Sequence, residues 1–114
     1  MVVSSNFKAI DFYKKNSLKY YASSLKTCNR FSVSNLLNDS KFRTLLNDLT
    51  VGAEKKIFKG INDIRADEVH LYIAVPKDKL AMFENIEAAI HVLDIKNIGK
   101  VKVFVTTIEN AVGL

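Results

Sequence analysis

Few residues of this sequence have the types and the spacing that catalysis requires. Nucleophilic catalysis needs a cysteine or serine beside a base that a third group orients. Cys28 falls among apolar positions, where a buried, inert thiol is expected. His70 belongs to a run that alternates as a β-strand, and His91 follows Glu87 by one helical turn, a spacing typical of a surface pair. We therefore predict no catalytic residue and no enzyme activity.

The same residue types give no indication of a metal or cofactor site. One Cys and two His that lie 21 positions apart fit no zinc-binding spacing. The acids at positions 63, 67, 68 and 78 lack the regular ligand spacing of a calcium loop. The glycines stand apart from one another and cannot form a phosphate-binding loop. We expect no bound metal and no cofactor.

The clearest signal in the sequence is the position of its positive charge. The 114 residues include 17 Lys and Arg against 12 Asp and Glu, and the sequence pI is near 9.4. Residues 1–30 hold six of these cations against one acid, and residues 31–114 are close to neutral. A high pI indicates nucleic-acid binding when the charge clusters on one element, as it does here.

The apolar residues of positions 5–29 recur at a spacing of three and four, which predicts one long amphipathic helix, or two with a break near Asn16. Its lysines would form a ridge that is compatible with a solvated face, with nucleic-acid phosphates or with an anionic membrane. We disfavour a membrane, because the apolar stripe is needed for the core. The candidate nucleic-acid-binding residues are Lys8, Lys15, Lys19, Lys26, Arg30, Tyr13 and Tyr20.

A leucine-rich helical stretch follows the first helix. It begins after Ser32 or Ser34, and Ser40 is a suitable cap for a short helix over residues 41–49. Gly52 is expected to end this helix, because glycine is favoured just past a helix C-terminus.

The last part of the chain predicts a strand–helix–strand unit. Residues 53–66 are compatible with a helix or an edge strand, and we favour the strand. Residues 69–75 alternate with a period of two, Pro76 suits the first turn of a helix, and residues 101–105 alternate again. An ordinary crossover makes these two strands parallel neighbours in one sheet.

The leucine-rich helix, then Val51-Gly52, then the strand–helix–strand order form a pattern that spans residues 35–105. In this pattern the chain resembles the DciA-type helicase loaders of bacterial replication. It is also similar to the KH-like first domain of the initiator DnaA and to the helicase-binding tail of the polymerase clamp-loader subunit. The resemblance implies a KH-like α+β fold, no catalysis, and binding to a replicative helicase and to DNA.

We therefore predict one α+β domain over residues 1–114. N-terminal helices should pack on a two- or three-stranded sheet, with a basic helix over residues 1–30 and an α+β body over residues 31–114. The first helix would be longer than such a sheet, so we expect a homodimer through it. A single cysteine and the lack of a signal-like or membrane-spanning run predict a cytoplasmic protein.

Two functions of different class follow from these features. The first is a nucleic-acid-associated adaptor in DNA replication, which binds the phosphates of DNA or RNA through the basic helix and a protein partner through the body. The alternative is a protein–protein interaction module, such as an inhibitor, an immunity protein or an assembly subunit, without nucleic-acid binding.

Overall fold

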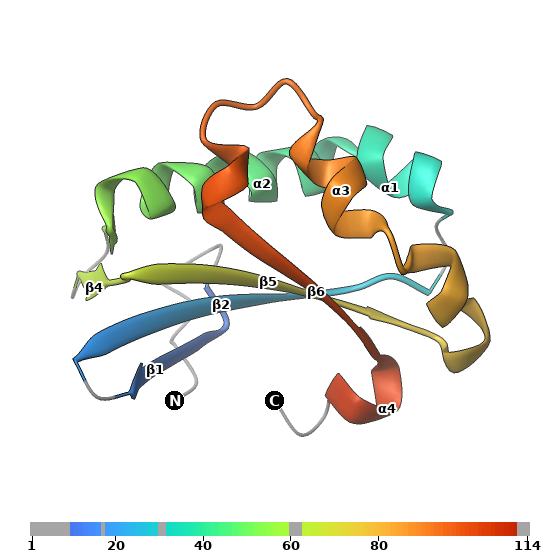
Figure 1. Cartoon of the computed structure of the whole chain (residues 1–114), viewed down its shortest axis with the longest axis horizontal. Helices are drawn as coiled ribbons and strands as arrows, with labels where there is room; N and C mark the ends of the chain where they lie inside the picture. Colours follow the sequence, from blue (N-terminus) through green and yellow to red (C-terminus); the bar gives the residue numbers. More distant parts are fainter. Residues whose placement is uncertain (1–9, 17, 30–31, 60–62, 112–114) are drawn as a thin grey trace.

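The protein has an α+β fold in which helices cover one face of a four-stranded sheet (Figure 1). The computed structural model describes residues 10–16, 18–29, 32–59 and 63–111. The elements are β1 (Phe12–Asn16), β2 (Lys19–Thr27), α1 (Val33–Asn38), α2 (Ser40–Lys55), β3 (Ile57–Phe58), β4 (Ile64–Arg65), β5 (Glu68–Val75), the 3₁₀-helix η1 (Lys77–Phe83), α3 (Ile86–His91), the 3₁₀-helix η2 (Ile98–Lys100), β6 (Val101–Thr107) and α4 (Ile108–Ala111).

The main sheet has the strand order β1-β2-β5-β6. β1 and β2 are antiparallel, and Asn16 lies opposite Lys19. β2, β5 and β6 run parallel, so that Ala22, Val69 and Val101 lie side by side across the sheet. The chain crosses from β5 to β6 through η1 and α3, and the predicted parallel strand–helix–strand unit is therefore confirmed.

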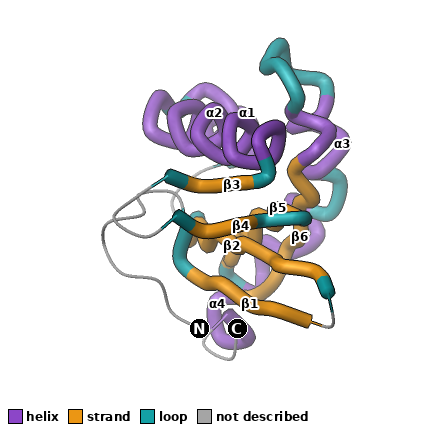
Figure 2. The backbone as a smooth tube through the Cα atoms, turned by 90° about the vertical axis from the view of Figure 1, so that its left-hand side faces the viewer, coloured by secondary structure: helices purple, strands orange, loops and turns teal. Residues whose placement is uncertain are grey.

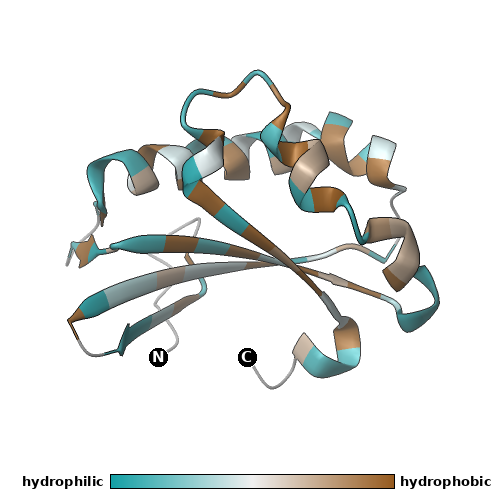
Figure 3. Cartoon of the chain, viewed as in Figure 1, coloured by the Kyte–Doolittle hydropathy of each residue, from teal (hydrophilic) through white to brown (hydrophobic). Residues whose placement is uncertain are grey.

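We name the face of the sheet that α1, α2 and α3 cover the inner face (Figure 2). Along most of β5, apolar residues alternate with hydrophilic ones (Figure 3). Val69, Leu71 and Ile73 of β5 point to the inner face and are buried in one core with Phe42 and Leu46 of α2. Full burial of such a side chain contributes about 1.5–3 kcal/mol. The core therefore lies between the inner face and the helices.

The long first helix predicted over residues 5–29 is wrong in the part of it that the structure describes, because residues 12–16 and 19–27 form the antiparallel strands β1 and β2. The break expected near Asn16 is the end of β1. β2 pairs with β5 along its length, and this pairing satisfies the backbone groups that a helix would satisfy internally. The main sheet therefore has four strands instead of two or three, and the argument for a homodimer through a long helix no longer holds.

The leucine-rich stretch forms helices, but the second of them begins and ends at other residues than predicted, since the N-cap of α2 is Asp39 and not Ser40. Ser32 caps α1 as expected, because its hydroxyl accepts a hydrogen bond from the backbone N–H of Asn35 at 3.2 Å. α2 continues through Gly52 and ends before Lys56, which has a left-handed φ of 58°. A Cβ at Gly52 would collide with the ring of Phe58, so this glycine lets the ring pack against the helix.

Two further segments differ from the predicted elements. Residues 53–55 complete α2, and the rest of the ambiguous segment contributes β3 and β4, which pair as a small antiparallel sheet. The strand expected there is thus confirmed in part. After Pro76 the chain first forms the 3₁₀-helix η1, and the regular helix α3 begins only at Ile86.

Candidate functional site

We name the face of the main sheet opposite the helical layer the outer face, and the described residues leave much of it uncovered. Of the described α-helices, α4 alone lies on this side (Figure 1). It covers one end of the face, where Ala74 and Ala111 are buried. The strand register places a mixed set of side chains on the remaining part: Lys14, Lys19, Tyr21, Leu25, Glu68, His70, Tyr72, Lys102 and Phe104.

Four rings at the centre of the outer face form an aromatic cluster, namely Tyr21, His70, Tyr72 and Phe104. The His70 ring lies 5.5 Å from that of Tyr21 and 5.2 Å from that of Phe104. Tyr72 stacks on Phe104 at 5.2 Å. Ring pairs of this kind contribute about 0.5–1.5 kcal/mol beyond the area that they bury. Phe104 is nevertheless 40% exposed, so the cluster presents apolar surface to its surroundings.

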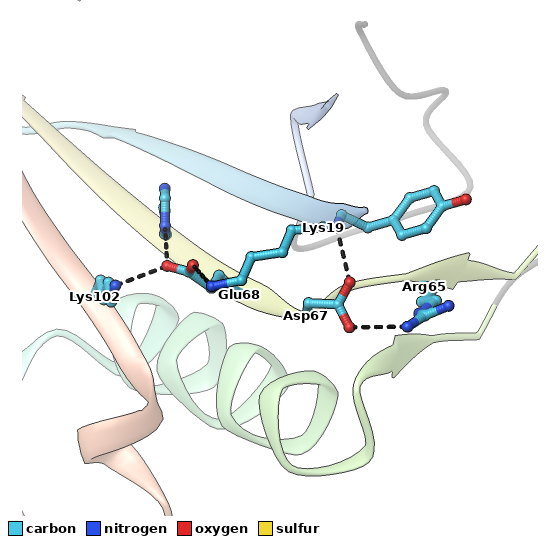
Figure 4. Close-up of polar contacts among 7 residues, drawn as sticks. Lys19, Arg65, Asp67, Glu68 and Lys102 are labelled. Carbon is cyan, nitrogen blue, oxygen red and sulfur yellow. Dashed lines mark hydrogen bonds and ion pairs between the residues drawn. The ribbon is translucent and has the colours of Figure 1, made fainter. Parts of the chain in front are cut away.

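A carboxylate with three donors borders the aromatic cluster (Figure 4). The oxygens of Glu68 accept hydrogen bonds from Nζ of Lys102 at 2.7 Å and of Lys19 at 3.4 Å, and one of them lies 3.3 Å from Nε2 of His70. The hydrogen bond from Lys102 and the contact with His70 lower the pKa of Glu68 to about 2. Two ammonium groups share one carboxylate, so this edge of the cluster is positively charged.

A second polar group lies beyond Glu68, where β2 meets β4 (Figure 4). Asp67 accepts the backbone N–H of Tyr20 at 2.9 Å and pairs with Arg65 at 3.3 Å. The backbone hydrogen bond is the main reason that the pKa of Asp67 is lowered. The Tyr20 ring stacks on Tyr13 at 5.8 Å, with Nζ of Lys15 at 5.2 Å and the guanidinium of Arg65 at 5.3 Å from its centre.

The structure brings three of the predicted nucleic-acid-binding residues together and separates the others. Tyr13, Tyr20 and Lys15 share the inner side of the hairpin, where both tyrosines are half-buried and pack on each other. Lys19 lies on the outer face, and Lys26 lies opposite Ile73 on the inner side near the far end of β2. The predicted single ridge is therefore wrong, because alternate residues of a strand point to opposite faces.

Two members of that set, Lys8 and Arg30, lie outside the described residues. Nucleic-acid binding by the set as a whole stays a prediction. Cys28 is buried, as expected from its apolar surroundings.

The other residues singled out for chemistry have structural partners. His91 and Glu87 were expected to form a surface pair, but each binds the backbone of β6 instead. Nε2 of His91 lies 2.9 Å from the carbonyl oxygen of Val101, and a carboxylate oxygen of Glu87 accepts the N–H of Val103 at 2.9 Å. These contacts hold α3 against the edge strand of the sheet, beside a groove of about 390 Å³.

The aromatic cluster was not predicted, although its signal was present in the sequence. His70 and Tyr72 alternate with buried residues along β5, as Lys102 and Phe104 do along β6. Two parallel strands in register bring these four side chains to one face. Whether that face is open depends on where the helices pack, and periodicity along one strand does not contain this information.

No family model matches this sequence, and no curated protein matches it. Among solved structures, the chain is similar to one in the "CdiA-CT/CdiI toxin and immunity complex from Yersinia pseudotuberculosis". The TM-score is 0.57 and the sequence identity 21%, over 94% of this chain and 87% of that chain. At this identity the likeness shows a shared fold.

Two further observations concern the described residues. None of the described helices is long and apolar enough to cross a membrane. Within the described part of the chain, no group of three or more His, Cys, Asp and Glu side chains is arranged to hold a metal ion.

Proposed function

We propose that this protein is a non-catalytic protein–protein interaction module and that it binds a partner protein through the outer face of its sheet. The observation that carries the proposal is the partly exposed aromatic cluster of the outer face, in which Phe104 is 40% exposed. Aromatic side chains are enriched at the buried centres of protein interfaces, where they contribute most of the binding energy. A charged rim around such a centre is equally typical, and Lys19 and Lys102 occupy that position.

The similar solved structure supports an interaction function of a specific type. Its title describes a complex of a toxin with an immunity protein. We infer that this chain likewise acts as one member of a pair of proteins that inhibit or protect by binding. This function requires no cofactor and no catalytic constellation.

The adaptor in DNA replication stays a prediction of the sequence. Its proposed lysine ridge depends on a helix, whereas residues 12–16 and 19–27 form strands. The outer face does not depend on that helix. The interaction module is therefore the better supported of the two functions.

Capture followed by lysine cross-linking tests the proposal. The tagged chain is expressed in its source cells, purified with its bound proteins and treated with an amine-reactive cross-linker. Cross-links from a stoichiometric partner should fall on Lys14, Lys19 and Lys102. Cross-links confined to Lys41, Lys55 and Lys96, which lie on or beside the helical layer, would contradict the proposed face.

A matched pair of variants identifies the specific partner. The double variant Tyr72→Ala/Phe104→Ala removes two stacked rings of the aromatic cluster. Val51→Ala/Val92→Ala removes exposed apolar side chains from the helical side of the molecule. The specific partner should be lost from the first variant and retained by the second. A protein that both variants capture equally is not bound by the outer face.

A further inference from the structure

We infer that the surface recognised by the outer face is acidic: a protein surface that presents carboxylates around an apolar side chain. This inference rests on the proposed function and adds the chemistry of the partner. The apolar side chain would contact the aromatic cluster, and the carboxylates would meet the lysines beside it.

The charges of the outer face are unbalanced. Lys14, Lys19 and Lys102 lie on it against Glu68 as the acid that the register places among them. Glu68 is only 19% exposed, and its oxygens already contact three donors. The Glu68 carboxylate therefore already has partners within the molecule, and the excess positive charge faces outward.

The two lysines that contact Glu68 are held differently. Lys102 lies 2.7 Å from the carboxylate and Lys19 lies 3.4 Å from it, while their side chains are similarly exposed, at 59% and 62%. An ion pair as exposed as that of Lys19 contributes at most about 1 kcal/mol and exchanges easily with another carboxylate. Lys19, with Lys14 on the neighbouring strand, is thus available to a partner, while Lys102 keeps Glu68 in place.

The surface of the helical layer lacks this bias. The exposed residues of α2, α3 and their connections mix both signs in equal number, with Lys41, Lys55, Lys56, Lys96 and Lys100 among Asp48, Glu54, Glu84, Glu87 and Asp94. A partner carboxylate would meet repulsion as well as attraction there. Complementary potentials raise association rates and exclude wrong partners, so the outer face is the surface where an acidic partner gains most.

The arrangement of the rings favours a protein over a single-stranded nucleic acid. Bases bind by stacking on free ring faces. Here Tyr72 and Phe104 stack on each other with an interplanar angle of 23°, and His70 lies edge-on to both. The faces of these rings are thus already in contact with other rings of the cluster. An apolar side chain of a partner protein does not need a free ring face, because contact with any part of the cluster buries its apolar area.

Selection from a phage-displayed library of random peptides tests the inference. The immobilised full chain should enrich peptides in which Asp and Glu flank an aromatic or aliphatic residue. Affinity of a selected peptide should fall by about tenfold or more in Lys14→Gln/Lys19→Gln and fall with rising salt. The control Lys41→Gln/Lys55→Gln, on the exposed side of α2, should bind as the wild type does, and circular dichroism verifies that all three proteins are folded.

The opposite results would overturn the inference. Neutral or basic selected peptides would contradict it, as would equal affinity for both variants. Binding of the oligonucleotides dT20 or rU20 that a selected peptide displaces would assign the face to nucleic acid instead. A captured protein that cross-links to Lys14 and Lys19 through a non-acidic surface would refute this inference alone, whereas cross-links confined to the helical side would refute the proposed function as well.

Discussion

The two faces of the main sheet are built from the same strands but have opposite chemistry. On the inner face, β5 and β6 contribute aliphatic residues such as Leu71 and Val103, which are buried beneath the helices. On the outer face, the residues next to them are His70, Tyr72 and Phe104, which remain partly exposed. The difference teaches that the core needs only one face of each strand, so that the other face is available for binding.

The comparison predicts that substitutions on the inner face cost the most stability. Leu71→Ala should lower the free energy of unfolding by about 2–5 kcal/mol, because it leaves a cavity in the core. Phe104→Ala on the neighbouring strand should cost less than Leu71→Ala, because the ring of Phe104 is 40% exposed. Urea denaturation of both variants measures the difference, and equal losses would show that the outer face is also part of the core.

Gly52→Ala tests how tightly the inner side is packed. Alanine normally stabilises a helix by about 1 kcal/mol relative to glycine. Here the added methyl group would meet the ring of Phe58, which is buried, so we expect a net loss of about 1–3 kcal/mol in thermal unfolding. Adding Phe58→Leu should recover part of the loss. A stabilised single variant would refute this account of why α2 contains a glycine.

The smallest expected effect concerns the charges of the outer face. The pKa of Glu68 is lowered from 4.5 to about 2, so its ion pairs stabilise the fold above pH 4.5, and this contribution is lost as the pH falls toward 2. The loss should stay below about 1 kcal/mol, because both lysines are exposed to water. Glu68→Gln should flatten the stability profile in this range relative to the control Glu54→Gln. Parallel profiles of the two variants would contradict the geometry around Glu68.

The comparison of faces also explains which elements the sequence could predict. β5 and β6 were predicted correctly because their inner residues are uniformly aliphatic, as in Val69, Leu71 and Ile73. β2 contributes Ala22 and Ser24 to its buried side and Tyr21 to its outer side, so neither side reads as a continuous apolar stripe. The helical spacing of the apolar residues in the N-terminal segment is therefore a coincidence.

A local signal for the hairpin was nevertheless present. Aromatic residues favour strands. Two of them, Phe12 and Tyr13, precede the break near Asn16, and two more, Tyr20 and Tyr21, follow it. The end of α2 was missed for a different reason. Gly52 has the residue type of a helix terminus, but Phe58 requires the glycine inside the helix, and this tertiary contact is not visible in the local pattern.

The candidate site could be predicted only as far as its residue types. The tyrosine and lysine excess near the N-terminus included Lys19 among the candidate residues, but the residues beside it, Glu68 and Lys102, lie far away in the sequence. Their approach depends on the parallel pairing of β2 with β5 and of β5 with β6. Without the strand order, no spacing rule connects these positions.

The affinity of the captured partner for two variants tests the central claim most directly. Isothermal titration would compare Tyr72→Ala/Phe104→Ala on the outer face with Val51→Ala/Val92→Ala on the helical side. If the aromatic cluster is the centre of the interface, the first variant should lose about 100-fold or more in affinity, and the second should stay within about twofold of the wild type. Unchanged affinity of the first variant, with a loss in the second, would contradict the assignment of binding to the outer face.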